Sequence, residues 1–161
     1  ILKNYVVEFD YQENQLILWS NSDLLKERYK IKPNQVIPFT MAHHLPVIKA
    51  KIGDKLFRFG LDSGAETNMI EPEWQEQLDG RFEVIGMEAL NGAGTSQRNV
   101  LKVEMRDFTL NEESYTMNFL FAQQYGGDHE ITMMDGLIGN QFLRHRKTAV
   151  NYLDNELYFV N

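Results

Sequence analysis

Residues 57–70, "FRFGLDSGAETNMI", join an alternating apolar run to a turn that begins with an acid. Phe57, Phe59 and Leu61 recur at every second position, which predicts a strand with one buried face. Asp62 follows directly, and Gly64 can adopt the backbone conformations that a tight turn needs. Because burying an unpaired charge is costly, this carboxylate has two interpretations: an ordinary Asx-type turn, or an acid that is kept for its chemistry.

The composition limits both the fold and the partners. The chain has 161 residues, 43% of them hydrophobic, which is enough for one domain with a core. A formal net charge of -7 disfavours nucleic acid and anionic membranes as partners, because both select basic surfaces. No apolar run approaches the roughly 18 residues of a membrane-spanning helix. The absence of Cys excludes disulfides, thiol nucleophiles and thiolate metal sites.

The histidines do not form a pattern that binds metal. His43 and His44 are adjacent, so they would point apart on an extended chain. Asp128, His129 and Glu130 have no further ligand at metal-binding spacing. We therefore expect no metal and no other cofactor.

The periodicity along the chain is mostly two, which predicts a mainly β fold with short helices. The stretch 28–39 has two prolines and no clear period, so we interpret it as part of a connection. Short helices are expected at 22–29, opened by Ser22 or Asp23, at 72–78, opened by Glu71 and Pro72, and at 140–145. The predicted strands are 5–9, 15–19, 46–51, 56–61, 82–88, 98–105, 115–121, 148–152 and 156–160.

The two ends of the chain resemble each other. Residues 2–19 align without a gap with residues 143–160, at a constant offset of 141 (143 minus 2). Four positions are identical in the two copies, which are Leu2/Leu143, Tyr11/Tyr152, Asn14/Asn155 and Leu16/Leu157. One interpretation is that any two β-hairpins with a polar turn look alike. The other is that residues 1 to about 19 are the tail of a preceding copy of the same domain.

The second interpretation gives a division of the chain. Residues 1–22 would be the tail strands of a preceding lobe or an N-terminal hairpin, residues 23–45 a connection, and residues 46–161 the main lobe. The chain opens "ILKNYVVEF", with neither an initiator Met nor a signal-like start, so we expect a processed or excised piece of a longer protein.

Two motifs together resemble those of aspartic proteases of the pepsin and retropepsin kind. The first is Asp62-Ser63-Gly64-Ala65 after an apolar strand, and the second is "DGLIGNQFL" at 135–143, with the hydrophobic-hydrophobic-Gly segment that such proteins carry. The closing stretch "FLRHRKTAVNYLDNELYF" is also similar to the end of a pepsin-like lobe. The resemblance covers about residues 46–160 and implies a closed, retropepsin-like barrel lobe.

The resemblance also implies roles for individual residues. Asp62, Ser63 and Gly64 would be the catalytic loop, in which the Ser63 hydroxyl bonds to the partner loop. Leu137, Ile138 and Gly139 would support that loop from below, with Gly139 leaving room for the crossing chain.

The stretch 87–99 would be the flap, a hairpin that closes over a bound peptide, although an ordinary surface hairpin is the other interpretation. The residues that would contact substrate are Ala65, Asn91, Gly92, Ala93 and Gly94. The chain departs from the pattern of the proteases that it resembles in three places: no Tyr lies in the predicted flap, Asn140 stands where an Arg is typical, and Glu66 replaces the usual small polar residue or Asp.

The implied chemistry needs two aspartates, whereas the chain has one D-[ST]-G sequence. The second would come from a homodimer partner or from another lobe of the same protein. The sequence therefore predicts an aspartic endopeptidase lobe that hydrolyses peptide bonds. The alternative is a peptide-binding or structural lobe that keeps the fold without catalysis. The resemblance to secreted and envelope-located proteases implies a location outside the cytoplasm.

Overall fold

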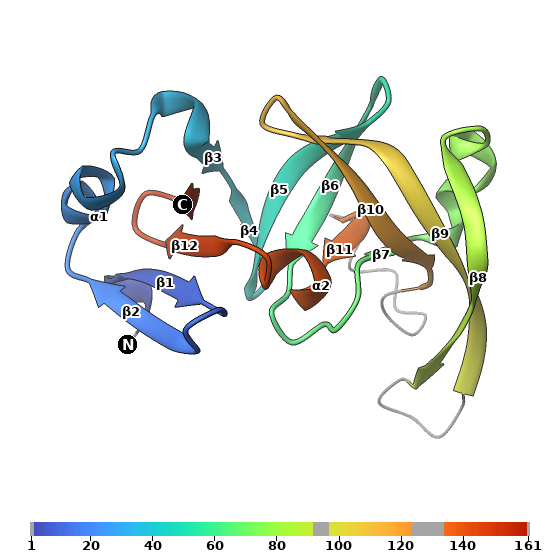
Figure 1. Cartoon of the computed structure of the whole chain (residues 1–161), viewed down its shortest axis with the longest axis horizontal. Coiled ribbons are helices and arrows are strands. Elements are labelled where there is room, and N and C mark those ends of the chain that lie inside the picture. Colours follow the sequence, from blue (N-terminus) through green and yellow to red (C-terminus); the bar gives the residue numbers. More distant parts are fainter. Residues whose placement is uncertain (1, 92–96, 124–133, 161) are drawn as a thin grey trace.

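The chain forms two β-sheets that lie side by side. The computed structural model describes residues 2–91, 97–123 and 134–160. In Figure 1 the smaller sheet lies on the left, where both hairpins at the ends of the sequence meet, and the larger sheet curls into a barrel on the right. None of the described helices has the length and apolar character needed to cross a membrane.

Six strands close the barrel. Their order is β5–β6–β11–β7–β10–β9, and β9 pairs with β5 again through Lys51–Thr109 and Ile52–Phe108. The edge strands β4 and β8 extend the sheet beyond the closure. The bounds are β4 Thr40–Ala42, β5 Leu45–Ile52, β6 Lys55–Leu61, β7 Met69–Ile70, β8 Phe82–Asn91, β9 Gln97–Leu110, β10 Glu113–Phe121 and β11 Gly136–Ile138. The predicted mainly β fold with a closed barrel is confirmed.

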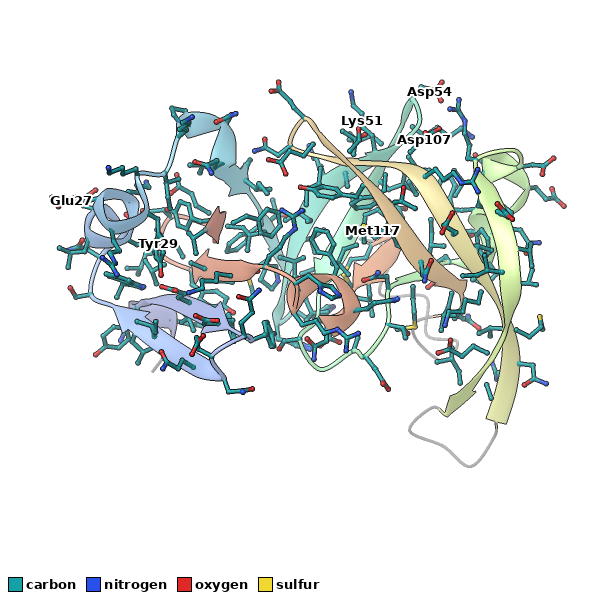
Figure 2. The ribbon with its side chains drawn as sticks, viewed as in Figure 1. Glu27, Tyr29, Lys51, Asp54, Asp107 and Met117 are labelled. Carbon is teal, nitrogen blue, oxygen red and sulfur yellow. The ribbon has the colours of Figure 1, made fainter. Side chains whose placement is uncertain are left out.

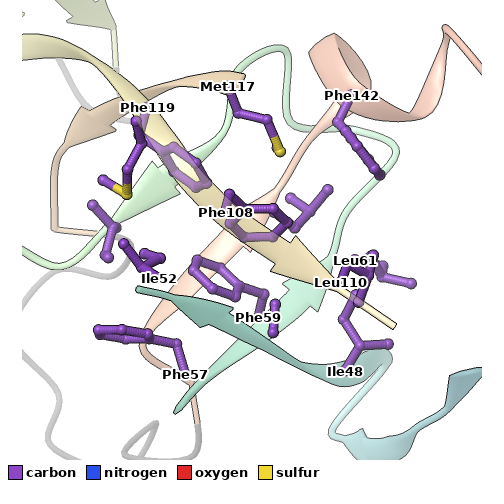
Figure 3. Close-up of a cluster of buried hydrophobic side chains, with 14 of the residues drawn as sticks. Ile48, Ile52, Phe57, Phe59, Leu61, Phe108, Leu110, Met117, Phe119 and Phe142 are labelled. Carbon is purple, nitrogen blue, oxygen red and sulfur yellow. The ribbon is translucent and has the colours of Figure 1, made fainter. Parts of the chain in front are cut away.

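Aromatic side chains fill the barrel (Figure 3). The Phe59 ring lies 5.5 Å from the Phe108 ring and 5.8 Å from the Phe119 ring, centroid to centroid. Phe57 packs edge-on against Trp74 at 5.1 Å. The alternation of Phe57, Phe59 and Leu61 on β6 places all three in this core, as the sequence predicts.

The smaller sheet has five strands in the order β2–β1–β12–β13–β3. Their bounds are β1 Val6–Asp10, β2 Gln15–Trp19, β3 Val36–Pro38, β12 Lys147–Asn151 and β13 Glu156–Val160. One face packs under α1 (Ser22–Tyr29) through Leu25 and Tyr29. The other face contributes Ile37, Val150, Leu157 and Phe159 to the barrel core. This sheet therefore joins the N-terminal hairpin to the base of the barrel.

The nine predicted strands are all present, with shifts at their ends. The largest extension is that of 98–105, which runs to Leu110 as β9. Four strands were not predicted, namely β3, β4, β7 and β11. Each has only two or three residues, too few for a period of two to be recognised. Two of them, β3 and β4, lie in the stretch that was interpreted as a connection.

The helices agree less well with the prediction. The first, α1, has the expected bounds, but Asn21 caps it by accepting a hydrogen bond from Leu24 N, so the expected caps Ser22 and Asp23 are wrong. The expected helix 72–78 is two 3₁₀ turns, η3 (Pro72–Trp74) and η4 (Glu76–Leu78). The last helix, α2 (Asn140–Leu143), ends before 145. Two further 3₁₀ turns are η1 (Leu2–Asn4) and η2 (Pro33–Gln35).

Both terminal hairpins have the same bounds at the sequence offset of 141, β1 matching β12 and β2 matching β13. They lie in one sheet, outside the barrel that carries Asp62. The division into residues 1–22, 23–45 and 46–161 remains a prediction.

Candidate active site

Asp62 lies at the end of β6, where the strand leaves the barrel. Its backbone N–H donates to Ile138 O at 3.0 Å, which holds it to the end of β11. The side chain is half-buried, whereas Ser63 and Gly64 are exposed. The Gly64 N–H donates to Asp62 Oδ1 at 2.9 Å, and the Ala65 N–H donates to Asp62 O at 3.2 Å. These two bonds form a tight loop that presents one carboxylate at the barrel rim.

The bond from Gly64 N to Asp62 Oδ1 is also the bond of an ordinary Asx turn. What distinguishes this loop is the chain that crosses beneath it. Asn140 N donates to Ala65 O at 2.7 Å, and Gln141 N donates to Glu66 O at 3.0 Å. Two backbone segments more than seventy residues apart in sequence are thereby fixed against each other.

Gly139 lies at the tightest point of this crossing. A Cβ atom at this position would stand 2.4 Å from Thr67 O and 2.7 Å from Ala65 O. Both neighbours are backbone atoms, which cannot move aside as a flexible side chain could. The absence of a side chain at Gly139 is therefore a condition for the loop to pack here.

Leu137 and Ile138 are buried on β11. Ile138 belongs to the barrel core that lies behind β6, where it pairs with Leu61. Leu137 lies in a second cluster with Leu45, Val47 and Met134. The parallel pairing of β11 with β6 thus places the two motifs of the sequence next to each other.

Asn68 is a contributor that the sequence analysis missed. Its buried side chain accepts a hydrogen bond from Gly139 N at 3.0 Å and donates to Asn118 O at 3.0 Å. It therefore links the loop to both β10 and α2. The only signal in the sequence is a polar residue directly before the apolar pair Met69 and Ile70, which is too common to be informative.

A small cavity of about 50 Å³ lies beside Ser63. Phe9 of β1 and Thr148 of β12 also line it, together with Tyr11, Pro46, Leu61, Leu143, Val150 and Tyr152. The loop that carries Asp62 is therefore close to the place where the two terminal hairpins pair. Thr148 Oγ1 is buried there without a hydrogen-bond partner among the described residues.

A cavity of about 550 Å³ lies elsewhere, and Asp62 does not line it. Tyr115, Phe142 and Arg146 line one part of it. Burial and a hydrogen bond to Glu113 raise the pKa of Tyr115 to about 12, while the Arg146 guanidinium lies 4.5 Å from the centre of its ring. These contacts stabilise the wall of the cavity, and none of the residues predicted for the site lies in it.

The stretch 87–99, predicted as the flap, includes the end of β8 and the start of β9, which pair up to Asn91 and Gln97. Asn91 is thus the last residue of β8, far along the chain from Asp62. Gly92, Ala93 and Gly94 lie outside the described residues. Ala65 is half-buried beside the loop. The structure therefore brings Asp62, Ser63, Gly64 and Ala65 together with residues 137–139.

Within residues 2–91, 97–123 and 134–160, no three His, Cys, Asp or Glu side chains are grouped so that they could hold a metal ion. His43 is at the turn between β4 and β5, so β5 separates it in the sequence from the loop of Asp62. The chemistry open to the described loop is that of one half-buried carboxylate and one exposed hydroxyl.

No family model matches the chain, and no curated protein matches it. Among solved structures, the chain is similar to a retropepsin-like aspartic protease from Rickettsia conorii, with a TM-score of 0.50 and 16% sequence identity. The match covers 78% of this chain and 86% of that chain. At this identity the likeness establishes a retropepsin-like fold and nothing finer.

Proposed function

We propose that the chain is one lobe of an aspartic endopeptidase, in which Asp62 is one of two carboxylates that activate a water molecule. The observation that carries the proposal is the loop at the end of β6. It presents Asp62 at the barrel rim, with Gly64 N–H on Oδ1 and with the Gly139 crossing beneath it. The retropepsin-like fold supports the same interpretation.

In the proposed reaction, two aspartates share one proton. The ionised carboxylate takes a proton from the water as it attacks the peptide carbonyl, and the protonated one donates to the carbonyl oxygen. The Gly64 N–H holds Oδ1 in place, which orients the carboxylate before substrate arrives. The Ser63 hydroxyl is exposed, so it is available to bond across to a partner loop.

The sequence supplies one D-[ST]-G loop, so the second aspartate belongs to another barrel. That barrel is either a second copy of the chain or another lobe of the same protein. Activity should therefore depend on assembly, and a monomeric 161-residue chain should be inactive.

The test is cleavage of an unfolded protein by the assembled, full-length protein, with Asp62→Asn as the variant. Asn has nearly the same shape but cannot act as the base, so turnover should fall by a factor of about 10⁴ or more. Ser63→Ala should have a smaller effect, because it loosens the loop without removing a reactant. The rate should fall on both sides of an acidic optimum, since one carboxylate must be ionised and its neighbour protonated.

Asp54→Asn is the matched control. Asp54 and Asp62 directly precede and follow β6, and Figure 2 labels Asp54 at the turn that begins the strand. Its side chain is exposed and forms an ion pair with Arg81. Cleavage should survive this change. If the Asp62→Asn protein cleaves as well as the parent, the protease proposal is wrong; if neither protein cleaves but both bind extended peptides, the lobe is a peptide-binding module.

A further inference from the structure

The β1–β12 pair has an internal two-fold symmetry. Under the sequence offset of 141, Glu8 corresponds to Ala149, and these two residues lie directly opposite each other. On either side, Val7 pairs with Val150 and Phe9 pairs with Thr148, so each pair is the image of the other. A two-fold axis perpendicular to the sheet therefore passes between Glu8 and Ala149.

The two hairpins also match in their turns. Asn14 and Asn155 correspond, and both have positive φ, 52° and 55°. Asp10 Oδ1 accepts hydrogen bonds from the N–H groups of the second and third residues after it. Asn151 Oδ1, at the corresponding position, accepts from its second and third residues in the same way. A shared polar turn would explain similar sequences, but it would not place the hairpins about a common axis.

The two halves differ in what covers them. Leu157 and Phe159 face the barrel and are 0% and 9% exposed. Their counterparts Leu16 and Leu18 lie on the same face of the sheet and are 51% and 44% exposed. In Figure 1 the β1–β2 hairpin lies at the lower left, away from the barrel. The axis thus relates a covered half-sheet to an uncovered one.

We infer that the face of β2 that carries Leu16 and Leu18 is the docking surface for a second barrel of the same fold. A two-fold axis perpendicular to the sheet does not exchange its two faces. It therefore places the second barrel over β1–β2 on the same face on which the described barrel lies over β12–β13. The edge of the sheet supports the inference. β13 pairs with β3 on its outer side, whereas β2 ends the described sheet, so a sixth strand can pair with β2.

The symmetry also identifies the source of the second barrel as the same polypeptide, N-terminal to β1. A second copy of the chain would have to bring its own β12–β13 hairpin to the place that β1–β2 already fills. The β1–β2 hairpin is instead the closing hairpin of the preceding barrel, joined through α1 to the barrel described above. This docking does not depend on catalysis.

One consequence rests on the proposed function. Ser63 lines a cavity together with Phe9 and Thr148, which pair beside the two-fold axis. The corresponding loop of the preceding barrel would approach the same axis from the other side. The second aspartate would therefore face Asp62 across it.

Thiol labelling tests the docking surface without any need for activity. The chain has no Cys, so Leu16→Cys and Leu18→Cys each add one known thiol. The alkylation rate by N-ethylmaleimide, followed on the peptide that carries the thiol, is compared between the 161-residue chain and the full-length polypeptide. Labelling should be at least about tenfold slower in the full-length protein, because the thiol then reacts only when the lobes open.

Leu56→Cys is the matched control. Leu56 is 58% exposed on β6 of the barrel, and its thiol should react at the same rate in both proteins. Amide hydrogen exchange of β2 in the unmodified proteins is a second measurement, and β2 should be more protected in the full-length protein. Equal labelling and exchange in the two proteins would overturn the inference.

Two other outcomes separate the proposals. If the thiols at positions 16 and 18 are already protected in the 161-residue chain, and this protection disappears on dilution, the docked barrel belongs to a second copy of the chain and the preceding barrel is not the partner. Protection in a full-length protein that cleaves no peptide would keep the docking surface and remove the protease proposal.

Discussion

Asn68 and Gly139, 71 residues apart in the sequence, are joined by a buried hydrogen bond of 3.0 Å from Gly139 N to Asn68 Oδ1. The amide nitrogen of the same side chain donates to Asn118 O. One side chain thus satisfies two backbone groups at the place where the loop of Asp62 crosses the start of α2. The loop of Asp62 is therefore held by this crossing as well as by the bonds of its own short turn.

Asn68→Ala should destabilise the protein by about 2 kcal/mol or more, because it leaves a buried N–H and a buried C=O without their partner. Denaturant unfolding followed by fluorescence measures the loss. Asn99→Ala, at an exposed position on β9, is the control and should change stability by less than about 0.5 kcal/mol. Similar stabilities for the two variants would show that Asn68 does not hold the crossing.

Gly139→Ala should cost more than about 2 kcal/mol, and Gly139→Val more again, because the added Cβ meets backbone oxygens at 2.4 and 2.7 Å. Gly64→Ala is the useful contrast. Its Cβ would meet only Asp62 Oδ1, at 3.2 Å. That variant should unfold close to the parent temperature while disturbing the carboxylate. A melting temperature unchanged by Gly139→Val would show that the crossing does not require Gly at this position.

The sequence predicts the long strands of the barrel well for a physical reason. Long strands with one buried face, such as β6, show the period of two in their own residues. The closed barrel was implied by the resemblance that the Asp62 and Gly139 segments carry. The pairing of β1 with β12 and the role of Asn68 were not predictable in this way. Both depend on which distant segments meet, and neither a single polar residue nor a short strand indicates its partner in the sequence.

The same difference explains the helices. Helix α1 has the expected bounds because Asn21 caps its first turn and Leu25 is buried on one face. The segment 72–78 has an equally good start at Pro72, yet it forms two 3₁₀ turns. Trp74 packs on Phe57 in the barrel core. The packing of this short segment against the barrel decides its backbone, and local preference does not.

Asp10 and Lys147 should make stability depend on pH at the acid end. Lys147 Nζ lies 2.6 Å from Asp10 Oδ2, and this hydrogen bond holds the pKa of the buried Asp10 below its usual value. On lowering the pH, the unfolded chain binds a proton at this group at about pH 4, while the folded protein still keeps it ionised. The stabilisation is therefore complete above about pH 4 and is lost as the pH falls through the lower pKa of the folded state.

Asp10→Asn tests this with little change of shape. Asn151 occupies the corresponding turn of the other hairpin and accepts the same two backbone N–H bonds, so Asn fits this position. The variant should be less stable than the parent at pH 6, and the gap should narrow as the pH falls below 4. Thermal unfolding midpoints between pH 2 and pH 6 measure the gap. A gap that stays constant over this range would mean that the ion pair contributes nothing.

Glu8, at the two-fold axis, should control the ionisation of Tyr29. Tyr29 OH donates to Glu8 Oε1 at 2.6 Å, and Trp19 Nε1 donates to Glu8 Oε2 at 2.7 Å, so the buried carboxylate is held by two donors. Figure 2 labels Tyr29 at the end of α1. Burial, and then the hydrogen bond and charge of Glu8, raise the pKa of Tyr29 to about 12.

Glu8→Gln removes the charge, so the pKa of Tyr29 should fall toward 10 without reaching it, because burial remains. An ultraviolet titration reports all the tyrosines together. Tyr29→Phe is therefore prepared both with Glu8 and with Gln at position 8, and subtracting each titration from that of the matching protein with Tyr29 leaves the contribution of Tyr29.

Glu8→Gln should also destabilise the protein by about 1.5–3 kcal/mol, the usual contribution of hydrogen bonds to a charged group. If the Tyr29 titration does not move, Glu8 does not control the ionisation of Tyr29, and burial alone raises its pKa.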